Sequence, residues 1–152
     1  MLKKLDREEE RALIEGVDRQ YGSKLEICGL FLEKQEKRGA RKIFLYTGER
    51  IPNVPAEWTG QHFCTVKEDI IIPSIEGAAA IGKKSEKAIE LSHEEAVYIM
   101  SGRDVELKEE KERGYYILKT GDDVLGIGLV ENRRIINQTP KSRRTMQQFR
   151  TI

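Results

Sequence analysis

The C-terminal end of the chain concentrates the side chains best suited to bind an anion. The stretch from Glu131 to Ile152 has six basic residues and one acidic residue, so it carries +5 and leaves −4 for residues 1–130. Local potential, more than the overall net charge, steers charged partners, so this end predicts a surface for a polyanion. The alternative is a solvated tail without a partner, and charge alone does not separate the two. The six bases are Arg133, Arg134, Lys141, Arg143, Arg144 and Arg150.

Three of these bases follow Pro140, which cannot donate a hydrogen bond to a strand ladder. Lys141, Arg143 and Arg144 are therefore expected on a segment that has left regular sheet pairing. Arginine can bind phosphate through two N–H groups and can stack on an unpaired base. These contacts suit RNA.

Glycines give a second feature that could admit a nucleic acid. Gly126 and Gly128 are two residues apart on a predicted strand, so both are expected to point to one face and leave a strip without side chains. RNA could lie against that strip, or the glycines could simply relieve crowding where the sheet bends. Gly102 is expected to take the left-handed position that ends a helix. Arg103 after it, and Lys119 on the strand beside the glycines, could extend the basic patch, although each alone is more simply a surface charge.

Residues that could support catalysis or hold a metal are sparse. His62 and Cys64 are two apart on a predicted strand and are expected to share a face, but no third ligand is spaced with them. We therefore expect a structural role for this pair. Cys28 and Cys64 form no CxxC pair, and the glycine-rich stretch lacks the lysine and hydroxyl residue of a phosphate-binding loop. We expect no enzymatic activity, metal or cofactor.

The elements that position these residues change type along the first half of the chain. Asp6 caps a predicted helix with an acid-rich first turn, and Gly22 ends it. A strand-like period then predicts a hairpin, two further strands and a short helix. These elements cover residues 27–33, 42–47, 62–66, 69–72 and 75–81.

The second half begins after the polar stretch 83–87, which predicts a domain boundary. Ser92 and Glu95 form a capping box for a helix that runs to Met100. The remainder is predicted as β-structure with turns at Gly121–Asp123 and at Glu131-Asn132. The strands are predicted over 88–91, 115–120, 124–130 and 135–139.

Length and composition bound the class of protein. The chain has 152 residues, 35% of them charged and 38% hydrophobic, which allows one compact domain or two small ones. It is too short for a barrel enzyme or a complete dinucleotide-binding enzyme. No apolar run reaches the roughly 18 residues of a membrane span, and the N-terminus is charged, so we expect a cytoplasmic protein without a membrane partner.

The second half carries a recognisable order of motifs. A capped helix ends in Ser-Gly-Arg-Asp (101–104), and the strands Gly-Tyr-Tyr-Ile-Leu-Lys (114–119) and Leu-Gly-Ile-Gly-Leu-Val (125–130) follow. This order resembles a PUA domain, a small pseudo-barrel that binds RNA. The ending Asn-Gln-Thr-Pro-Lys-Ser-Arg-Arg (137–144) is similar to the close of the PUA-like segment in the NOL1/NOP2/Fmu family of ribosome-biogenesis proteins. The whole chain resembles the short archaeal members of that family, which lack the methyltransferase domain.

We therefore predict an α+β protein, with an N-terminal α/β pre-PUA domain (1–84) before a C-terminal PUA-like pseudo-β-barrel (85–152). The resemblance implies a non-catalytic factor in rRNA or tRNA maturation or ribosome biogenesis, which binds structured RNA and leaves its N-terminal domain free for a protein partner. Two alternatives stay open. One is an adaptor whose basic tail binds an acidic protein surface; the other is an accessory subunit that completes an RNA-modifying enzyme, such as an RNA methyltransferase, in trans. The predicted RNA-binding residues are Gly102, Arg103, Lys119, Gly126, Gly128, Arg133, Arg134, Lys141, Arg143 and Arg144.

Overall fold

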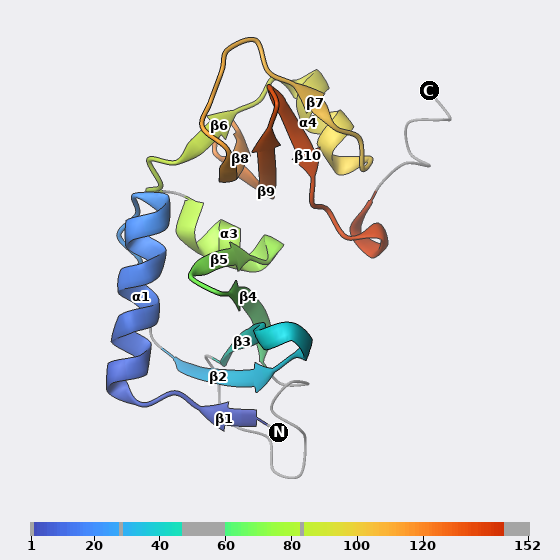
Figure 1. Cartoon of the computed structure of the whole chain (residues 1–152). Coiled ribbons are helices and arrows are strands. Elements are labelled where there is room, and N and C mark those ends of the chain that lie inside the picture. The colour runs from blue at the N-terminus through green and yellow to red at the C-terminus, as the bar shows by residue number, and fades with distance from the viewer. Residues whose placement is uncertain (1, 28, 47–59, 83, 145–152) are drawn as a thin grey trace.

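The computed structural model describes residues 2–27, 29–46, 60–82 and 84–144 (Figure 1). This part of the chain forms two five-stranded sheets, with strand orders β1-β2-β3-β4-β5 and β6-β8-β9-β10-β7. We call the first sheet A and the second sheet B. The expectations for Cys28 and Arg150 lie outside the described residues.

Sheet A is an antiparallel meander that follows the chain order. The long helix α1 (Arg7–Tyr21) begins at the predicted cap, because the Asp6 carboxylate accepts from the Glu9 backbone N–H and the Glu9 carboxylate accepts from the Asp6 backbone N–H. The helix ends at Gly22, which is in the left-handed region (φ 56°). The other elements of this half are β1 (Leu2–Lys4), β2 (Leu30–Gln35), η1 (Lys37–Gly39), β3 (Arg41–Tyr46), β4 (Gln61–Lys67), β5 (Ile70–Pro73) and α3 (Ile75–Gly82).

A β-bulge in β4 corrects the prediction that His62 and Cys64 share a face. Ile43 pairs with Cys64 but its neighbour Phe44 pairs with His62, so Phe63 is the extra residue of the bulge. Phe63 and Cys64 are consequently both buried in the core, and His62 is left on the opposite face. Burial raises the pKa of the Cys64 thiol to about 12, which leaves it unreactive at neutral pH.

Sheet B is strongly curved and forms the C-terminal half of the molecule. Its strands β8, β9 and β10 are antiparallel neighbours, whereas β6 pairs with β8 in parallel. Helices plus two sheets, the second one curled, confirm the predicted α+β class. The elements of this half are β6 (Ala88–Glu90), α4 (His93–Met100), β7 (Val105–Glu106), β8 (Gly114–Thr120), β9 (Asp123–Glu131), β10 (Arg134–Asn137) and η2 (Lys141–Arg143).

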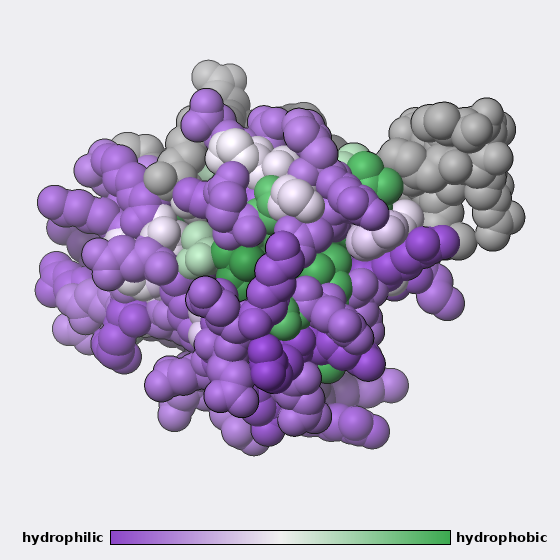
Figure 2. All heavy atoms as spheres, turned by 90° about the horizontal axis from the view of Figure 1, so that it is seen from above, coloured by the Kyte–Doolittle hydropathy of each residue, from purple (hydrophilic) through white to green (hydrophobic). Residues whose placement is uncertain are grey.

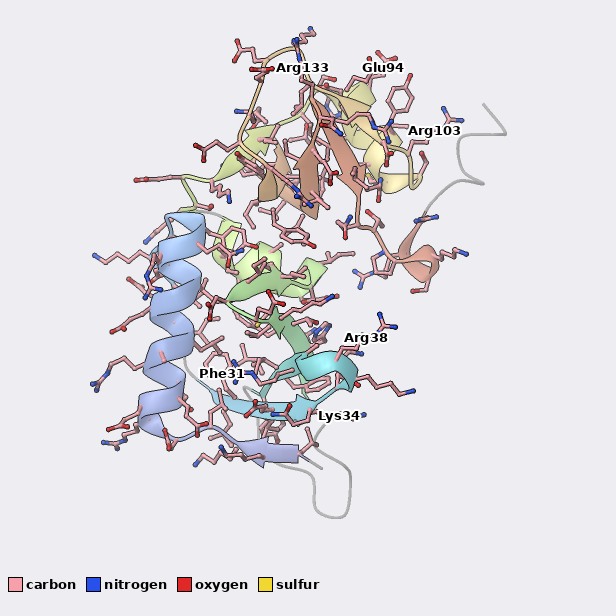
Figure 3. All side chains as sticks on the ribbon, in the orientation of Figure 1. Phe31, Lys34, Arg38, Glu94, Arg103 and Arg133 are labelled. Atoms are coloured by element: carbon pink, nitrogen blue, oxygen red, sulfur yellow. The ribbon has the colours of Figure 1, made fainter. Side chains whose placement is uncertain are left out.

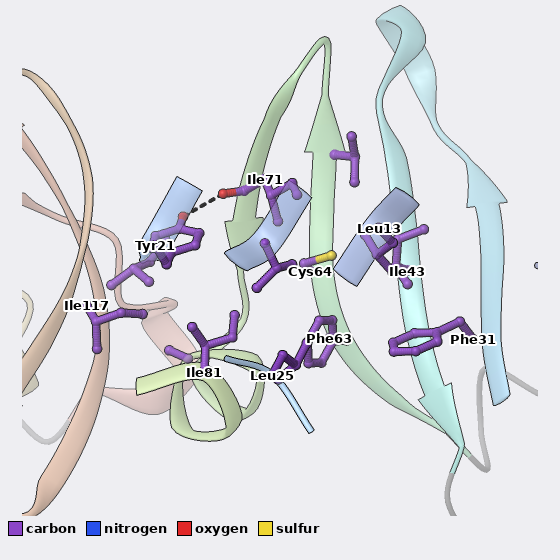
Figure 4. Packing of buried hydrophobic residues seen from close by; sticks show 14 of the residues in the cluster. Leu13, Tyr21, Leu25, Phe31, Ile43, Phe63, Cys64, Ile71, Ile81 and Ile117 are labelled. Carbon is purple, nitrogen blue, oxygen red and sulfur yellow. Dashed lines mark hydrogen bonds between the residues drawn. The ribbon is translucent and has the colours of Figure 1, made fainter. Parts of the chain in front are cut away.

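One hydrophobic core crosses from the first half to the second. Val17 and Tyr21 of α1 and Ile81 of α3 are buried in the same cluster as Ile117 of β8 and Ile127 of β9 (Figure 4). Each of these side chains is at most 8% exposed, so the sheets are joined by packing as well as by the chain. The division at residue 84 stays a prediction.

The other face of sheet B has a core of its own. Helix α4 packs there, and Ile99 is buried with Leu118, Val130 and Ile135. Sheet B is therefore packed on both faces, so a partner would bind at the ends or edges of its strands.

Among the described residues, no helix is long and apolar enough to cross a membrane.

Candidate nucleic-acid interface

The C-terminal end of α4 contacts an arginine from the C-terminal end of the described chain. Gly102 follows the helix with a positive φ of 90°, and a Cβ placed on it would lie 2.5 Å from the Cδ and Nε atoms of Arg144. Arg144 therefore lies directly over the bare Gly102 backbone. Its Nε donates to the Thr139 carbonyl at 3.1 Å, which fixes the side chain in this position. The structure thus brings together two predicted site residues that are 42 positions apart in the chain.

The strand end of β10 holds this helix end in place. The Asn137 side-chain amide donates to the carbonyl of Ile99 at 2.8 Å and to that of Arg103, just past the end of α4, at 2.7 Å. The Ile99 carbonyl also accepts from the Gly102 backbone at 3.1 Å, so Asn137 ties the strand end to the last turn of the helix. Asp104 accepts from the Asn137 backbone and pairs with Arg134, both at 2.9 Å. We call Gly102, Arg103, Asp104, Arg134, Asn137 and Arg144 the helix-end cluster. Asp104 and Asn137 were not predicted as site residues, because their role depends on contacts between distant parts of the chain.

Arg103 is held on the surface of α4 by an aromatic ring. Its guanidinium carbon lies 5.6 Å from the centre of the Tyr98 ring, and the Tyr98 hydroxyl donates to Glu94 at 3.0 Å. Figure 3 shows Arg103 and Glu94 on the side of the molecule opposite to α1. Because Arg103 is exposed, it can bind an anion without leaving this ring.

The short turn η2 carries the remaining bases to the rim of a cleft between the two halves. Arg143 pairs with Glu76 of α3 at 2.7 Å, so it joins the C-terminal half to the N-terminal half. This hydrogen bond lowers the pKa of Glu76, whose carboxyl group is therefore ionised at neutral pH. Lys141 is exposed on the same turn, and no ion pair joins it to another described residue.

The cleft has a volume of about 390 Å³ and is bounded by sheet A, the start of α3, sheet B and η2. Its lining combines apolar side chains with a few polar groups, as is usual for sites that bind small organic groups. The lining residues are His62, Thr65, Ile72, Pro73, Ser74, Ile75, Glu76, Gly126, Ile127, Gln138, Thr139, Pro140, Ser142 and Arg143.

His62 presents a fixed, neutral ring to this cleft. Burial, and secondarily the charge of Lys42, lowers the pKa of the imidazole, so it is uncharged at neutral pH. Its Nε2 donates to the Cys64 carbonyl at 3.0 Å and lies 3.2 Å from the Thr65 hydroxyl, while the Phe44 ring is centred 5.7 Å away. Within the described residues, no three His, Cys, Asp or Glu side chains are grouped so that they could hold a metal ion.

The prediction of a strip without side chains along β9, open to RNA, is wrong, because Gly126 and Gly128 are both buried. A Cβ on Gly128 would collide with Ile135 and Leu118 of the second core. Gly126 has a φ of 140° and lies beside a shift in the pairing of β8 with β9, so it faces Ile75 and the cleft instead. The glycines allow close packing and a bend in the sheet, which is the alternative that the sequence left open.

Two other predicted residues lie apart from the helix-end cluster. Arg133 occupies the two-residue turn between β9 and β10 with a positive φ of 61°, and it donates to the Lys108 carbonyl at 2.9 Å. Figure 3 shows it at the far end of sheet B, away from η2. Lys119 is half-buried on β8, and no described hydrogen bond or ion pair joins it to the cluster.

The surface at this end of the molecule is predominantly hydrophilic. Seen from above sheet B, hydrophilic side chains cover most of it, and hydrophobic ones form a small area near the middle (Figure 2). Such a surface suits a charged partner better than an apolar one.

The comparison with known families agrees with this architecture. Residues 86–145 match the family model described as the methyltransferase RsmF PUA domain. The curated proteins contain no match to the chain. The matched segment covers β6 to η2 and includes the whole helix-end cluster. The C-terminal half is therefore similar to the PUA domain of RsmF-type methyltransferases, which confirms the predicted resemblance to a PUA domain. The resemblance of the whole chain to the short archaeal family members stays a prediction.

Proposed function

We propose that this protein binds structured RNA through its PUA-like half, without modifying it, as a factor in rRNA or tRNA maturation. The observation that carries the proposal is the position of Arg144 on the bare backbone of Gly102. This contact fixes the basic end of the chain against α4, so Lys141, Arg143 and Arg144 are presented from an ordered surface.

The arrangement suits the RNA backbone for electrostatic reasons. The segment from residue 138 to residue 144 has three basic and no acidic side chains, and Arg103 adds a fourth base beside it. Arg143 has a carboxylate partner in the free protein, but that contact is solvent-exposed and therefore weak. A phosphate can replace this carboxylate at little cost, and arginine binds it through two N–H groups. Arg103 is exposed and can bind a phosphate while it keeps its contact with the Tyr98 ring.

A salt titration of the full chain tests this proposal. We expect a hairpin RNA of mixed sequence to bind with log affinity falling against log salt at a slope of roughly −2 to −4, which corresponds to about three to five phosphate contacts. Polyglutamate provides the comparison, because an adaptor for acidic protein surfaces would prefer it to RNA. The absence of RNA binding even at low salt would overturn the proposal.

A second candidate function is that of an accessory subunit for an RNA-modifying enzyme. The observation that favours it is that the matched module is described as part of a methyltransferase. In this case the chain would present RNA to a catalytic protein bound to its N-terminal half. Co-purification of a methyltransferase that lacks its own PUA domain, with methyl transfer to RNA stimulated by the chain, would support this candidate. Methyl transfer by the purified chain alone would contradict both proposals.

A further inference from the structure

The face of sheet A that points away from α1 carries a set of side chains that the PUA-like half does not explain. Residues paired across antiparallel strands share a face. The register therefore places Lys34, Lys42 and Thr65 in one row, beside a second row that contains Lys4, Phe44 and His62. We give the name far face to eight residues of these two rows, which are Lys4, Leu32, Lys34, Lys42, Phe44, His62, Thr65 and Ile72.

The far face is accessible and leads directly into the cleft. None of its eight residues is buried, although the opposite face of the same sheet is packed under α1. His62, Thr65 and Ile72 belong both to the far face and to the cleft lining. The far face is therefore continuous with η2, where Arg143 stands at the cleft rim.

The charges along this path favour a polyanion. Lys4, Lys34 and Lys42 lie on the far face, and Arg143 lies at the cleft rim. Lys42 and Arg143 each have a partly exposed carboxylate partner among the described residues. Those carboxylates are Glu36, which is 3.6 Å from Lys42, and Glu76. An acidic peptide would satisfy the charges as well as a nucleic acid would, but it would not use the rings of Phe44 and His62.

We propose that the cleft and the far face form a site for a single-stranded segment of RNA, with one unpaired base stacked on His62 in the cleft. The phosphates on either side of that base lie at Arg143 and Lys42. This inference rests on the proposed RNA binding, and it adds that the N-terminal half selects unpaired nucleotides next to the RNA held by the helix-end cluster.

The geometry of His62 supports stacking. Its Nε2 is engaged by the Cys64 carbonyl and its ring is backed by Phe44, so the imidazole is oriented before any ligand arrives. A neutral ring stacks on a base of any sequence, because every base has a π face. The cleft volume of about 390 Å³ lies near the lower end of the range of about 300–1,000 Å³ found for small-ligand sites, which suits one nucleotide rather than several.

Arg143 can exchange its partner when RNA enters. Its side chain is 49% exposed and that of Glu76 is 37% exposed, so their ion pair contributes little stability. A phosphate at the cleft rim would replace the carboxylate and leave Glu76 free to accept from an N–H group of the base. The ion pair thus occupies the Arg143 guanidinium only until the ligand binds.

Two RNA probes test the site in the full-length protein. One is a hairpin with a loop of four unpaired nucleotides, and the other is a blunt duplex with the sequence of its stem. His62→Gln removes the ring but keeps a side-chain N–H that can donate to the Cys64 carbonyl, and Phe44→Leu removes the second ring. The matched control is His93→Gln, which changes the exposed histidine at the start of α4.

We expect His62→Gln to weaken hairpin binding about tenfold and Phe44→Leu to weaken it less, with duplex binding unchanged and His93→Gln without effect. A base analogue in the loop, 2-aminopurine, should show quenched fluorescence on binding the native protein and lose this quenching in His62→Gln. Equal hairpin affinity in all variants, with duplex RNA still bound, would overturn the far-face site alone. No binding of either RNA would instead contradict the proposed function, and thermal unfolding checks that each variant is folded.

Discussion

Gly102 and Gly128 were both predicted as RNA-binding residues, but the structure uses them in opposite ways. Neither position has room for a Cβ. At Gly102, the space is taken by the polar, half-exposed side chain of Arg144. At Gly128, it is taken by Ile135 and Leu118, which are both completely buried.

The difference shows what a bare stretch of backbone can mean. A glycine covered by core side chains allows two elements to approach, and its replacement disturbs folding. A glycine covered by an exposed arginine positions a charge, and its replacement should disturb binding as well. The neighbour that fills the space, rather than the glycine itself, separates the two cases.

The largest effect is expected at Gly128. Gly128→Val places two methyl groups against Ile135 and Leu118, so we expect a loss of about 3 kcal/mol in the free energy of unfolding. For a chain of this size, this corresponds to a fall in Tm of roughly 6–12 °C. Chemical denaturation and calorimetry measure both values. If the folded fraction of the variant lost its RNA affinity, the comparison with Gly102 would break down.

Removal of the bases that Gly102 helps to position should have the next largest effect. In the triple variant Lys141→Gln, Arg143→Gln, Arg144→Gln, we expect RNA affinity to fall about tenfold or more and the salt slope to become shallower by about 2–3. A matched control removes three bases from the loop between β7 and β8: Lys108→Gln, Lys111→Gln, Arg113→Gln. Equal losses in the two triple variants would show that total charge, and not the position of the bases on and beside η2, governs binding.

A smaller effect is expected for Gly102→Ala, which displaces Arg144 without removing any charge. The added Cβ collides with Arg144 and the residue must keep a φ of 90°, so we expect RNA affinity to fall about threefold and stability to fall by about 1 kcal/mol. Gly121→Ala is the control, because Gly121 also has a positive φ but nothing lies within 4 Å of its added Cβ. The control should lose stability and keep its RNA affinity; a matching loss of affinity would attribute the effect to backbone strain.

The smallest effect is expected for Glu76→Gln, which tests whether the ion pair or Gly102 holds η2. Because the Arg143–Glu76 pair is exposed, its loss should change stability by less than about 0.5 kcal/mol. RNA affinity should stay within about twofold of the native value, since Arg144 remains over Gly102. A larger loss of affinity in isothermal titration than Gly102→Ala causes would reverse the roles of the two contacts.

Elements determined by neighbours along the chain could be predicted from the sequence. Helices α1 and α4 begin at Asp6 and Ser92, because each capping box depends on residues only three positions apart. Strands β1 and β7 were missed, since they are short and form by pairing with distant strands. The bulge at Phe63 was missed for the same reason, and it changed the face on which His62 lies.

In the candidate site too, features that depend on neighbouring residues were predictable, and contacts between distant residues were not. The basic residues of the chain end were evident from charge and from Pro140. Their partners were not, because Glu76 is 67 residues from Arg143 and Asp104 is 30 residues from Arg134. The open strip on β9 was predicted from regular alternation, which the shift in pairing beside Gly126 interrupts.

The core that joins α1 and α3 to sheet B has a consequence for how the molecule unfolds. Opening either half alone would expose Val17 and Ile81 on one side or Ile117 and Ile127 on the other, at a cost in apolar burial that neither half could recover. We therefore expect folding to be cooperative over both halves, so that backbone amides in α1 and β8 exchange with solvent through the same global opening. An RNA bound to η2 would then protect amides in α1, although it never touches that helix.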